Sequence, residues 1–518
     1  MAQHATRQTR TDDRPPRRLP LWVAVALSLA LVGPTLAMAG NGQGIVGTVG
    51  KGMPLVFLIG LVGVALVGYG FIRLTRRLNH AGSVYALVGV VIGPRAGFFA
   101  GWAMLGAYVG FAVGLVGLIT GFVNALLLEL QNGRHDAFQV SWLVVTLVAV
   151  ALSALLAARD TKLVGKILMV IEGVGILGMV VLVIVIFAKG GAQSTGVDFS
   201  AFSLGNGVDF SGVVTGVVAA FLSWAGFEAC AALGEETDDP RRNIPRALAG
   251  TLALTGVLFV VVMFAQTIGF GTDAKGLAAF GSSGNTLGDL GTEYLNQPFG
   301  IVMIFAGVIS AFACLLASAS TAGRLLFAFA RDGFGPARLA ALDGPGRSPR
   351  NATWVVLGFV LLVNLLAWAT GWPDLGSGNT SYDSYAMFAT AGAVSLMAAY
   401  LMAEVAAVVF VTSARFRSIR QADGVDAGDS LGEGEGSRLL GVALPCLGFA
   451  FIALVLWYNV KGQHHPFSSP AYLGLTWAAV GLVGAVAARG VTRRMRTSLA
   501  DELAISPAAV RKSQLKTP

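Results

Sequence analysis

Long, continuous apolar runs dominate this sequence and leave few folds open to it. A helix needs about 20 apolar residues to cross the hydrocarbon layer of a bilayer, and runs of that order recur along the chain between its two polar ends. The runs are continuous rather than alternating, which excludes a transmembrane barrel. Only 12% of the residues are charged, against roughly 25% in a typical soluble domain. The sequence therefore predicts an all-α membrane protein.

Twelve runs qualify as membrane spans by this measure. We read the first as a span rather than a cleavable leader, because no processing site follows it. The runs cover residues 21–48, 53–73, 96–128, 138–158, 162–188, 210–234, 246–270, 298–330, 352–371, 384–413, 438–459 and 470–489.

The basic residues indicate how these spans are oriented. If the N-terminus is cytoplasmic, most of the 36 Lys and Arg residues fall on the cytoplasmic side. Cytoplasmic loops of membrane proteins carry such an excess, so both termini are predicted to be cytoplasmic. The net charge of +8 then reflects topology, and we expect no nucleic-acid partner. The opposite side holds only Lys51, Arg134, Lys189, Lys275 and Lys461.

This topology divides the chain into five parts. They are a basic cytoplasmic tail, a core of ten spans, a polar and disordered cytoplasmic loop, two further spans and a second cytoplasmic tail. The parts cover residues 1–20, 21–413, 414–437, 438–490 and 491–518.

No pattern in the sequence indicates a metal site or catalysis. Cys230, Cys314 and Cys446 each lie in an apolar run and lack metal-ligand spacing. The chain contains no nucleophile-elbow motif and no phosphate-binding loop. We therefore expect no metal, no cofactor and no enzyme activity.

The first run is interrupted by Gly33, Pro34 and Thr35. A proline inside a helix removes a backbone hydrogen bond and clashes with the preceding turn, and glycine tolerates the dihedral angles that result. Backbone that leaves a helix within a membrane must be buried or line a cavity. We predict an unwound segment whose amides and carbonyls bind a substrate, with a simple proline kink as the alternative.

The sixth run holds a comparable interruption, Ser223-Trp224-Ala225-Gly226, followed by Glu228. A carboxyl group at membrane depth is costly and usually functional. We predict a second break, with Glu228 in coupling or gating; a hydrated, structural Glu228 near a helix end is the alternative. The breaks lie about 190 residues apart and each opens a set of five spans, a spacing typical of two inverted repeats.

Two more carboxyl groups lie in apolar runs. Glu172 in the fifth run has apolar neighbours on both sides, which suits it to carry a proton. A partner on another helix or a water-filled vestibule is the alternative. Glu404, near the end of the tenth run, is expected to lie at the membrane interface.

Four stretches resemble the amino acid–polyamine–organocation permease family. One is the broken first run; the others are residues 81–102, 221–248 and 323–336. FLSWAGFEACAALGEETDDPRRNIPRAL is similar to the family's sixth span and the acidic, proline-containing loop after it. GRLLFAFARDGFGP is similar to the family's A-R-D-G-x-x-P pattern at the end of the eighth span. Together the four stretches cover most of residues 20–413.

The resemblance implies a core of ten helices in two inverted repeats, with two peripheral helices. The substrate would lie at mid-membrane between the first, third, sixth, eighth and tenth spans. Backbone amides of the first break would hold a carboxylate, and carbonyls of the second would hold an ammonium group; Trp224 could also cover the substrate as a gate. The implied binding residues are Gly33, Pro34, Thr35, Leu36, Ser223, Trp224, Ala225 and Gly226. By depth in their spans, Met104, Tyr108, Phe388 and Thr390 are further candidates.

Two departures from the family's pattern bear on substrate and coupling. Pro34 replaces a residue with an N–H, so one amide donor is missing; the Thr35 hydroxyl could substitute, and an amine without a carboxylate would lose less. Some members carry a lysine where Glu172 stands, which reverses the charge. A protonatable Glu172 favours proton symport over exchange or sodium coupling, although hydroxyl groups in the eighth span keep a sodium site open, namely Ser310, Ser318, Ser320 and Thr321.

The sequence thus predicts a secondary active transporter of amino acids or related small amines in a bacterial plasma membrane. Its expected partners are the substrate, a proton or other coupling ion, and the lipid bilayer. An exchanger and a sodium-coupled symporter stay open, and a sensor that binds substrate without moving it is the alternative from another class. The sequence predicts no oligomeric state.

Overall fold

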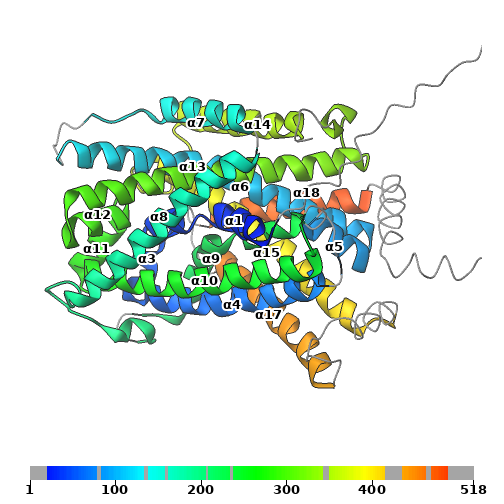
Figure 1. Ribbon diagram of the computed structural model, residues 1–518, viewed down its shortest axis with the longest axis horizontal. Coiled ribbons are helices and arrows are strands. Elements are labelled where there is room, and N and C mark those ends of the chain that lie inside the picture. The colour runs from blue at the N-terminus through cyan, green and yellow to red at the C-terminus, as the bar shows by residue number, and fades with distance from the viewer. Residues whose placement is uncertain are drawn as a thin grey trace, which may run out of the picture.

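The protein is helical throughout the part described by the computed structural model (Figure 1). Isolated bridge residues are present in that part, among them the pair Gly205 and Val208, and no extended strand occurs among the described residues. It comprises residues 20–76, 78, 83–132, 138–157, 161–205, 208–233, 237–341, 349–414, 435–461 and 468–487. The predicted tails at 1–20 and 491–518 and the loop at 414–437 therefore lie almost entirely outside the described residues.

Eleven helical segments of the described chain are long and apolar enough to cross a membrane. The fourth predicted run is the exception, because its helix α7 (Trp142–Ala157) has 16 residues and is shorter than this criterion requires. The all-α prediction is confirmed.

The first half of the chain contains both interrupted runs. The first run forms three helices rather than one, α1 to α3, and the sixth forms α9 followed by the 3-10 helix η3. The elements are α1 (Leu21–Val32), α2 (Pro34–Gly40), α3 (Gln43–Val49), η1 (Gly50–Gly52), α4 (Met53–Thr75), α5 (Ser83–Val91), α6 (Pro94–Leu130), α7, α8 (Thr161–Ala188), η2 (Phe199–Phe202), α9 (Phe210–Trp224) and η3 (Phe227–Leu233).

The second half has longer uninterrupted helices. Its longest predicted loop, 271–297, folds into two short helices, α11 and α12. The elements are α10 (Pro240–Phe270), α11 (Ala274–Ser282), α12 (Thr286–Tyr294), α13 (Gln297–Arg331), η4 (Ala337–Ala340), α14 (Arg350–Thr370), α15 (Thr380–Thr412), α17 (Glu435–Lys461) and α18 (Ser469–Ala487).

The long helices α6 and α15 pack against each other through small residues. A Cβ atom on Gly117 of α6 would lie 2.0 Å from the carbonyl oxygen of Ser381, and one on Gly110 would lie 2.7 Å from that of Phe388. Small residues allow such close backbone approach between membrane helices. The helix α15 also contacts α9, one of the helices that form the site described below.

The outer faces of the bundle are apolar. On α8, the exposed residues Val170, Leu177 and Ile184 are seven positions apart and are each more than 60% exposed, so they form a stripe along one helix face. A stripe of this kind suits contact with lipid chains.

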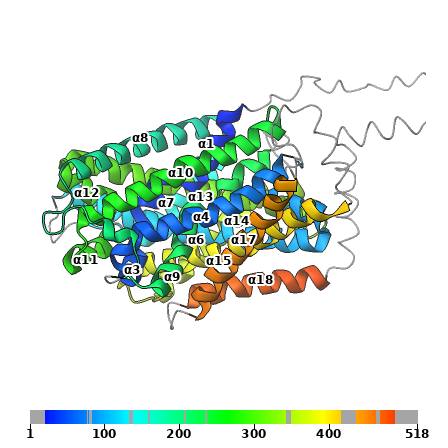
Figure 2. The ribbon, with the colours of Figure 1, turned by 90° about the horizontal axis from the view of Figure 1, so that it is seen from below.

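The helix α18 lies at the edge of the bundle (Figure 2) and is held there by a tryptophan pair. The rings of Trp102 and Trp477 are stacked, with centroids 4.8 Å apart. Each indole N–H donates to the other residue's backbone carbonyl, at 3.0 and 2.8 Å. The peripheral helix is therefore fixed to α6 by both packing and hydrogen bonds.

At the end of the bundle that carries α3 and α11, three connections meet at one carboxylate. The Asp198 side chain accepts hydrogen bonds from Lys51 Nζ and Thr272 Oγ1, both at 3.1 Å, and from the Ser200 hydroxyl at 2.6 Å. The Ser200 hydroxyl, followed by the Lys51 ammonium, lowers the pKa of Asp198 to about 2. The group therefore stays ionised at neutral pH.

Candidate functional site

The predicted break in the first run is present. Helix α1 ends at Val32, Gly33 adopts a left-handed conformation with φ 57°, and α2 starts at Pro34. Glycine enters this conformation without a steric penalty, and proline at the first helical position needs no N–H partner. A Cβ atom on Gly33 would also lie 3.0 Å from Leu36 Cδ2. The local sequence thus explains why the helix stops and restarts here.

The first amides of α2 are bonded by side chains from two other helices. The Thr35 N–H donates to Glu172 Oε1 of α8 at 2.7 Å, and the Leu36 N–H donates to Ser310 Oγ of α13 at 3.1 Å. The Glu172 side chain is 5% exposed. Of the possibilities predicted for Glu172, a proton carrier, a group with a partner on another helix or a group in a water-filled vestibule, the structure contains a partner on another helix, the Thr35 amide.

The second break is formed by Ala225 and Gly226. Helix α9 ends at Trp224, Gly226 has φ 96°, and a Cβ atom on it would lie 2.5 Å from Leu31 Cγ. The two broken helices are also hydrogen-bonded near their breaks: Ser28 Oγ of α1 donates to Phe227 O, at the start of η3, at 2.9 Å. They are therefore in direct contact although they are far apart in the sequence.

Glu228 lies beside the second break, fully buried. It accepts a hydrogen bond from Tyr108 of α6 at 2.6 Å and from Tyr400 of α15 at 2.7 Å. The carboxyl group thus connects η3 with two long helices. The two tyrosine hydroxyls are the hydrogen-bond partners that a buried ionisable group requires. The alternative of a hydrated Glu228 does not match this burial.

A polar tie connects the first run, α9 and α15. Asn41 Nδ2 donates to Ser223 Oγ at 2.8 Å, and the Tyr385 hydroxyl donates to Asn41 Oδ1. Asn41 is therefore bonded on both sides of its amide group, and we call Asn41, Ser223 and Tyr385 the asparagine tie.

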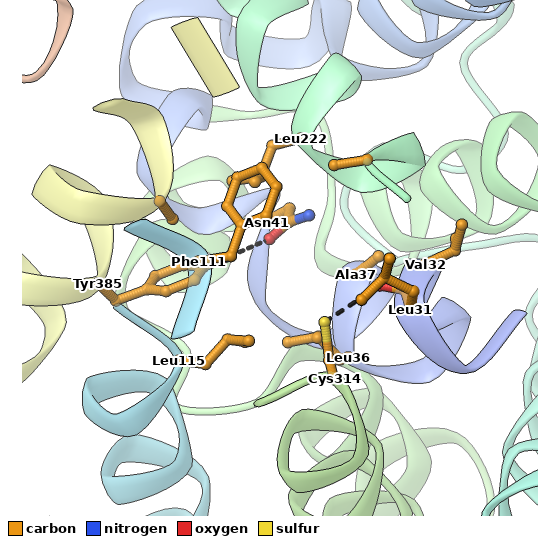
Figure 3. A pocket seen from close by; sticks show the side chains of 12 residues that line it. Leu31, Val32, Leu36, Ala37, Asn41, Phe111, Leu115, Leu222, Cys314 and Tyr385 are labelled. Carbon is orange, nitrogen blue, oxygen red and sulfur yellow. Dashed lines mark hydrogen bonds between the residues drawn. The ribbon is translucent and has the colours of Figure 1, made fainter. Parts of the chain in front are cut away.

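Asn41 and Tyr385 line a central cavity of about 30 Å³, enough for a water molecule or two. Figure 3 shows the side chains of Asn41, Phe111, Cys314 and Tyr385 around it. Its wall is mostly apolar, and none of its lining residues is charged. The lining residues are Leu31, Val32, Leu36, Ala37, Asn41, Phe111, Leu115, Leu222, Ala225, Cys314, Tyr385 and Ala389.

Of the predicted binding residues, Leu36 and Ala225 line this cavity. Ser223 is not on the cavity wall, but its hydroxyl accepts a hydrogen bond from Asn41, which is. Gly33, Pro34, Thr35 and Gly226 form the two breaks next to it.

Other predicted binding residues lie apart from the cavity wall. Trp224 packs on Phe57 and Phe259, with ring centroids 5.8 and 5.3 Å apart. Phe388 contacts Trp372. Tyr108 bonds Glu228, Met104 is buried in the core, and Thr390 lines a second pocket between α3, α9, α15, α17 and α18.

Sequence reasoning missed Asn41, Phe111, Cys314 and Tyr385. Asn41 could have been identified from the sequence, since an amide side chain within a long apolar run needs a hydrogen-bond partner. Glu404, expected at the level of the membrane interface, is fully buried within the protein, because α4 and α17 cover it at Gly70 and Gly448.

Comparisons with known proteins agree with a helical transporter. A family model described as "Amino acid permease" matches residues 23–422, and the chain belongs to this family. The resemblance drawn from the sequence is therefore confirmed, as is the prediction that the protein is not an enzyme, because its relatives are permeases. It is a multi-pass membrane protein.

Among curated relatives, the branched-chain amino acid permease BcaP of Lactococcus lactis is 25% identical over 59% of this chain and 66% of its own. The low-affinity putrescine importer PlaP of Escherichia coli is 25% identical over 55% of this chain and 60% of its own. The matched region thus spans slightly less than two thirds of these relatives.

Among solved structures, MhsT in complex with L-phenylalanine matches 84% of this chain and 98% of its own, with a TM-score of 0.55 at 17% identity. At this identity the likeness establishes the fold alone.

Proposed function

We propose that this protein is a secondary active transporter of amino acids or related small amines that works by alternating access. The observation that carries the proposal is the contact of two broken helices, α1–α2 and α9–η3, beside one small cavity. Broken helices of this kind form the substrate sites of inverted-repeat transporters. The names of two relatives, a branched-chain amino acid permease and a putrescine importer, support the proposed substrate range.

The proposed topology has twelve spans, with α7 as the fourth. Spans one to five and six to ten form two inverted repeats, and α17 and α18 are peripheral. Both termini are cytoplasmic, as the distribution of Lys and Arg supports, and the membrane is a bacterial plasma membrane.

Substrate binding is proposed at the two breaks, at Gly33 to Leu36 and at Ser223 to Gly226. Leu36 and Ala225 line the cavity, which supports these assignments. Met104, Tyr108 and Phe388 are proposed to contribute to the site from the surrounding helices. In the present conformation the cavity is too small for an amino acid, so binding requires the helices around it to separate.

Coupling is proposed to use a proton carried by Glu172. This carboxyl group accepts the Thr35 N–H, so a change in its charge acts directly on the first break. Glu228, bonded to α6 and α15, would pass the movement of η3 to those helices and so act in gating.

The test is uptake by the purified protein in liposomes with an inward proton gradient, beside the variant Glu172→Gln. We expect the gradient to drive uptake in the wild type and Glu172→Gln to exchange labelled substrate without responding to the gradient. Uptake driven only by a sodium gradient would identify a sodium symporter instead. Uptake driven only by internal substrate would identify an exchanger. Binding without counterflow would identify a sensor and contradict transport.

A further inference from the structure

The central cavity is poor in hydrogen-bond donors. Its lining side chains carry polar hydrogens only on Asn41, Cys314 and Tyr385. Asn41 Nδ2 bonds Ser223 and the Tyr385 hydroxyl bonds Asn41. The Cys314 thiol donates to the Leu31 carbonyl, with Sγ 3.1 Å from the oxygen. A carboxylate entering this space would find no lysine or arginine on the wall. Among the side-chain donors of the described wall, only the second N–H of the Asn41 amide is left over.

The backbone amides that the first break could offer to a ligand already have hydrogen-bond partners. Pro34 has no N–H, and the amides of Thr35 and Leu36 bond Glu172 and Ser310. The next amide, that of Ala37, bonds Gly33 O at 2.8 Å. The backbone amides in the first turn of α2 are thus satisfied by the protein itself, and Glu172 provides the carboxyl oxygen that accepts the Thr35 N–H. The buried Thr35 hydroxyl has no hydrogen-bond partner in the described chain.

Backbone acceptors, by contrast, are released beside the cavity. Because Pro34 lacks an N–H and the next two amides bond side chains, the carbonyls of Ala30, Leu31 and Val32 lose their helical donors, and the Leu31 carbonyl accepts the Cys314 thiol instead. Helix α9 also ends at the cavity, next to the lining residues Leu222 and Ala225. Two helix C-termini therefore meet there, and both favour a positive charge.

We propose that the ligand of this site is a small amine without a carboxylate. Its ammonium group binds the carbonyls at the ends of α1 and α9, and its apolar body packs against Phe111, Leu115 and Leu222. This inference rests on the proposed transport function and narrows it from amino acids and amines to amines alone.

The experiment compares pairs of compounds that differ only by the α-carboxylate. The pairs are 3-methylbutylamine with leucine, 2-phenylethylamine with phenylalanine, and putrescine with ornithine. Binding to the purified full chain is measured by thermal shift over a concentration series. We expect the amine of at least one pair to bind at least about 10-fold more tightly than its amino acid.

Two variants test the reason for this preference. Glu172→Ala leaves the Thr35 N–H without its acceptor, so we expect the preference for the amine to shrink by about 10-fold. Glu172→Gln keeps an acceptor oxygen for that N–H and should keep the wild-type preference. Ser310→Ala, which frees the Leu36 N–H, is the second variant if Glu172→Ala does not fold.

Leucine, phenylalanine or ornithine binding as tightly as its amine would overturn the inference and leave the transport proposal intact. Binding of no compound in any pair would also overturn it. An amine that binds but undergoes no counterflow in liposomes would support the ligand class and contradict transport, so the two failures are distinguishable.

Discussion

The buried carboxyl groups of this protein differ in how their oxygen atoms are satisfied. Glu228 accepts two tyrosine hydroxyls and Glu172 accepts an amide. Glu404 is fully buried between α15, α4 and α17, and within the described chain neither of its oxygens has a hydrogen-bond partner. An unsatisfied buried polar group costs about 1–3 kcal/mol, so Glu404 weakens the fold as it stands.

We therefore expect Glu404→Met, which keeps the length of the side chain and removes the polar oxygens, to raise the free energy of unfolding by about 1–3 kcal/mol. The measurement is thermal unfolding of the purified protein in detergent. Leu396→Met, on the same helix at a buried position, is the control for methionine itself and should cost less than about 1.5 kcal/mol. A lower melting temperature for Glu404→Met would mean that the carboxyl group stabilises the protein.

At the scale of elements, the contact between α6 and α15 depends on glycines at particular positions. A Cβ atom on Gly117 would lie 2.0 Å from Ser381 O, whereas one on Gly121, a turn further along α6, would meet nothing within 4 Å. The same chemical change at these two positions therefore has different consequences for the packing of the two helices.

Gly117→Ala should destabilise the protein by about 1–3 kcal/mol, because the new methyl group forces the backbones apart. Gly121→Ala should be neutral or stabilise by up to about 1 kcal/mol, because alanine favours the helix. Thermal unfolding of both variants provides the comparison. Equal melting temperatures would contradict the close backbone approach between these helices.

At the scale of the whole molecule, hydrogen bonds join three elements that are far apart in the sequence beside the cavity. The asparagine tie connects the first run with α9 and α15. Under the proposed topology, Asn41 is on the outer side of the first break. Opening toward the outside must then separate these three elements and break the tie.

Cys314 provides a native probe of this opening, because it lines the cavity and is a free thiol. In a Cys446→Ser background, Asn41→Ala should raise the rate of Cys314 labelling by an external, membrane-impermeant thiol reagent by about 10-fold, since each lost hydrogen bond contributes about 0.5–1.5 kcal/mol. Cys314→Ser controls for reaction at Cys230. An unchanged rate would mean that the tie does not hold the cavity closed.

Much of the fold could be predicted because its causes are local. The apolar runs specify helices by their length, and Pro34 and Gly33 end α1 through the backbone alone. Gly226 marks the second break for the same reason. The exception among the runs is the fourth, whose helix α7 is shorter than predicted.

The site could be predicted only in part. Residues of the breaks were identified, but Trp224, which the sequence suggests as a gate, packs against α4 and α10 instead. Side-chain direction at the end of a helix depends on which neighbours leave space, and that is a property of the packed bundle. For the same reason Phe111 and Tyr385 carried no signal in the sequence.

The sequence by itself determined that the chain is a helical membrane protein with two broken helices, because hydrophobicity and backbone restriction act over a few residues. Only the tertiary structure decided what the freed backbone groups bind. Glu172 and Ser310 are 137 and 274 positions away from the amides they accept, and contacts over such separations exist only once the helices are packed. Those contacts, more than the break itself, define which ligand the cavity suits.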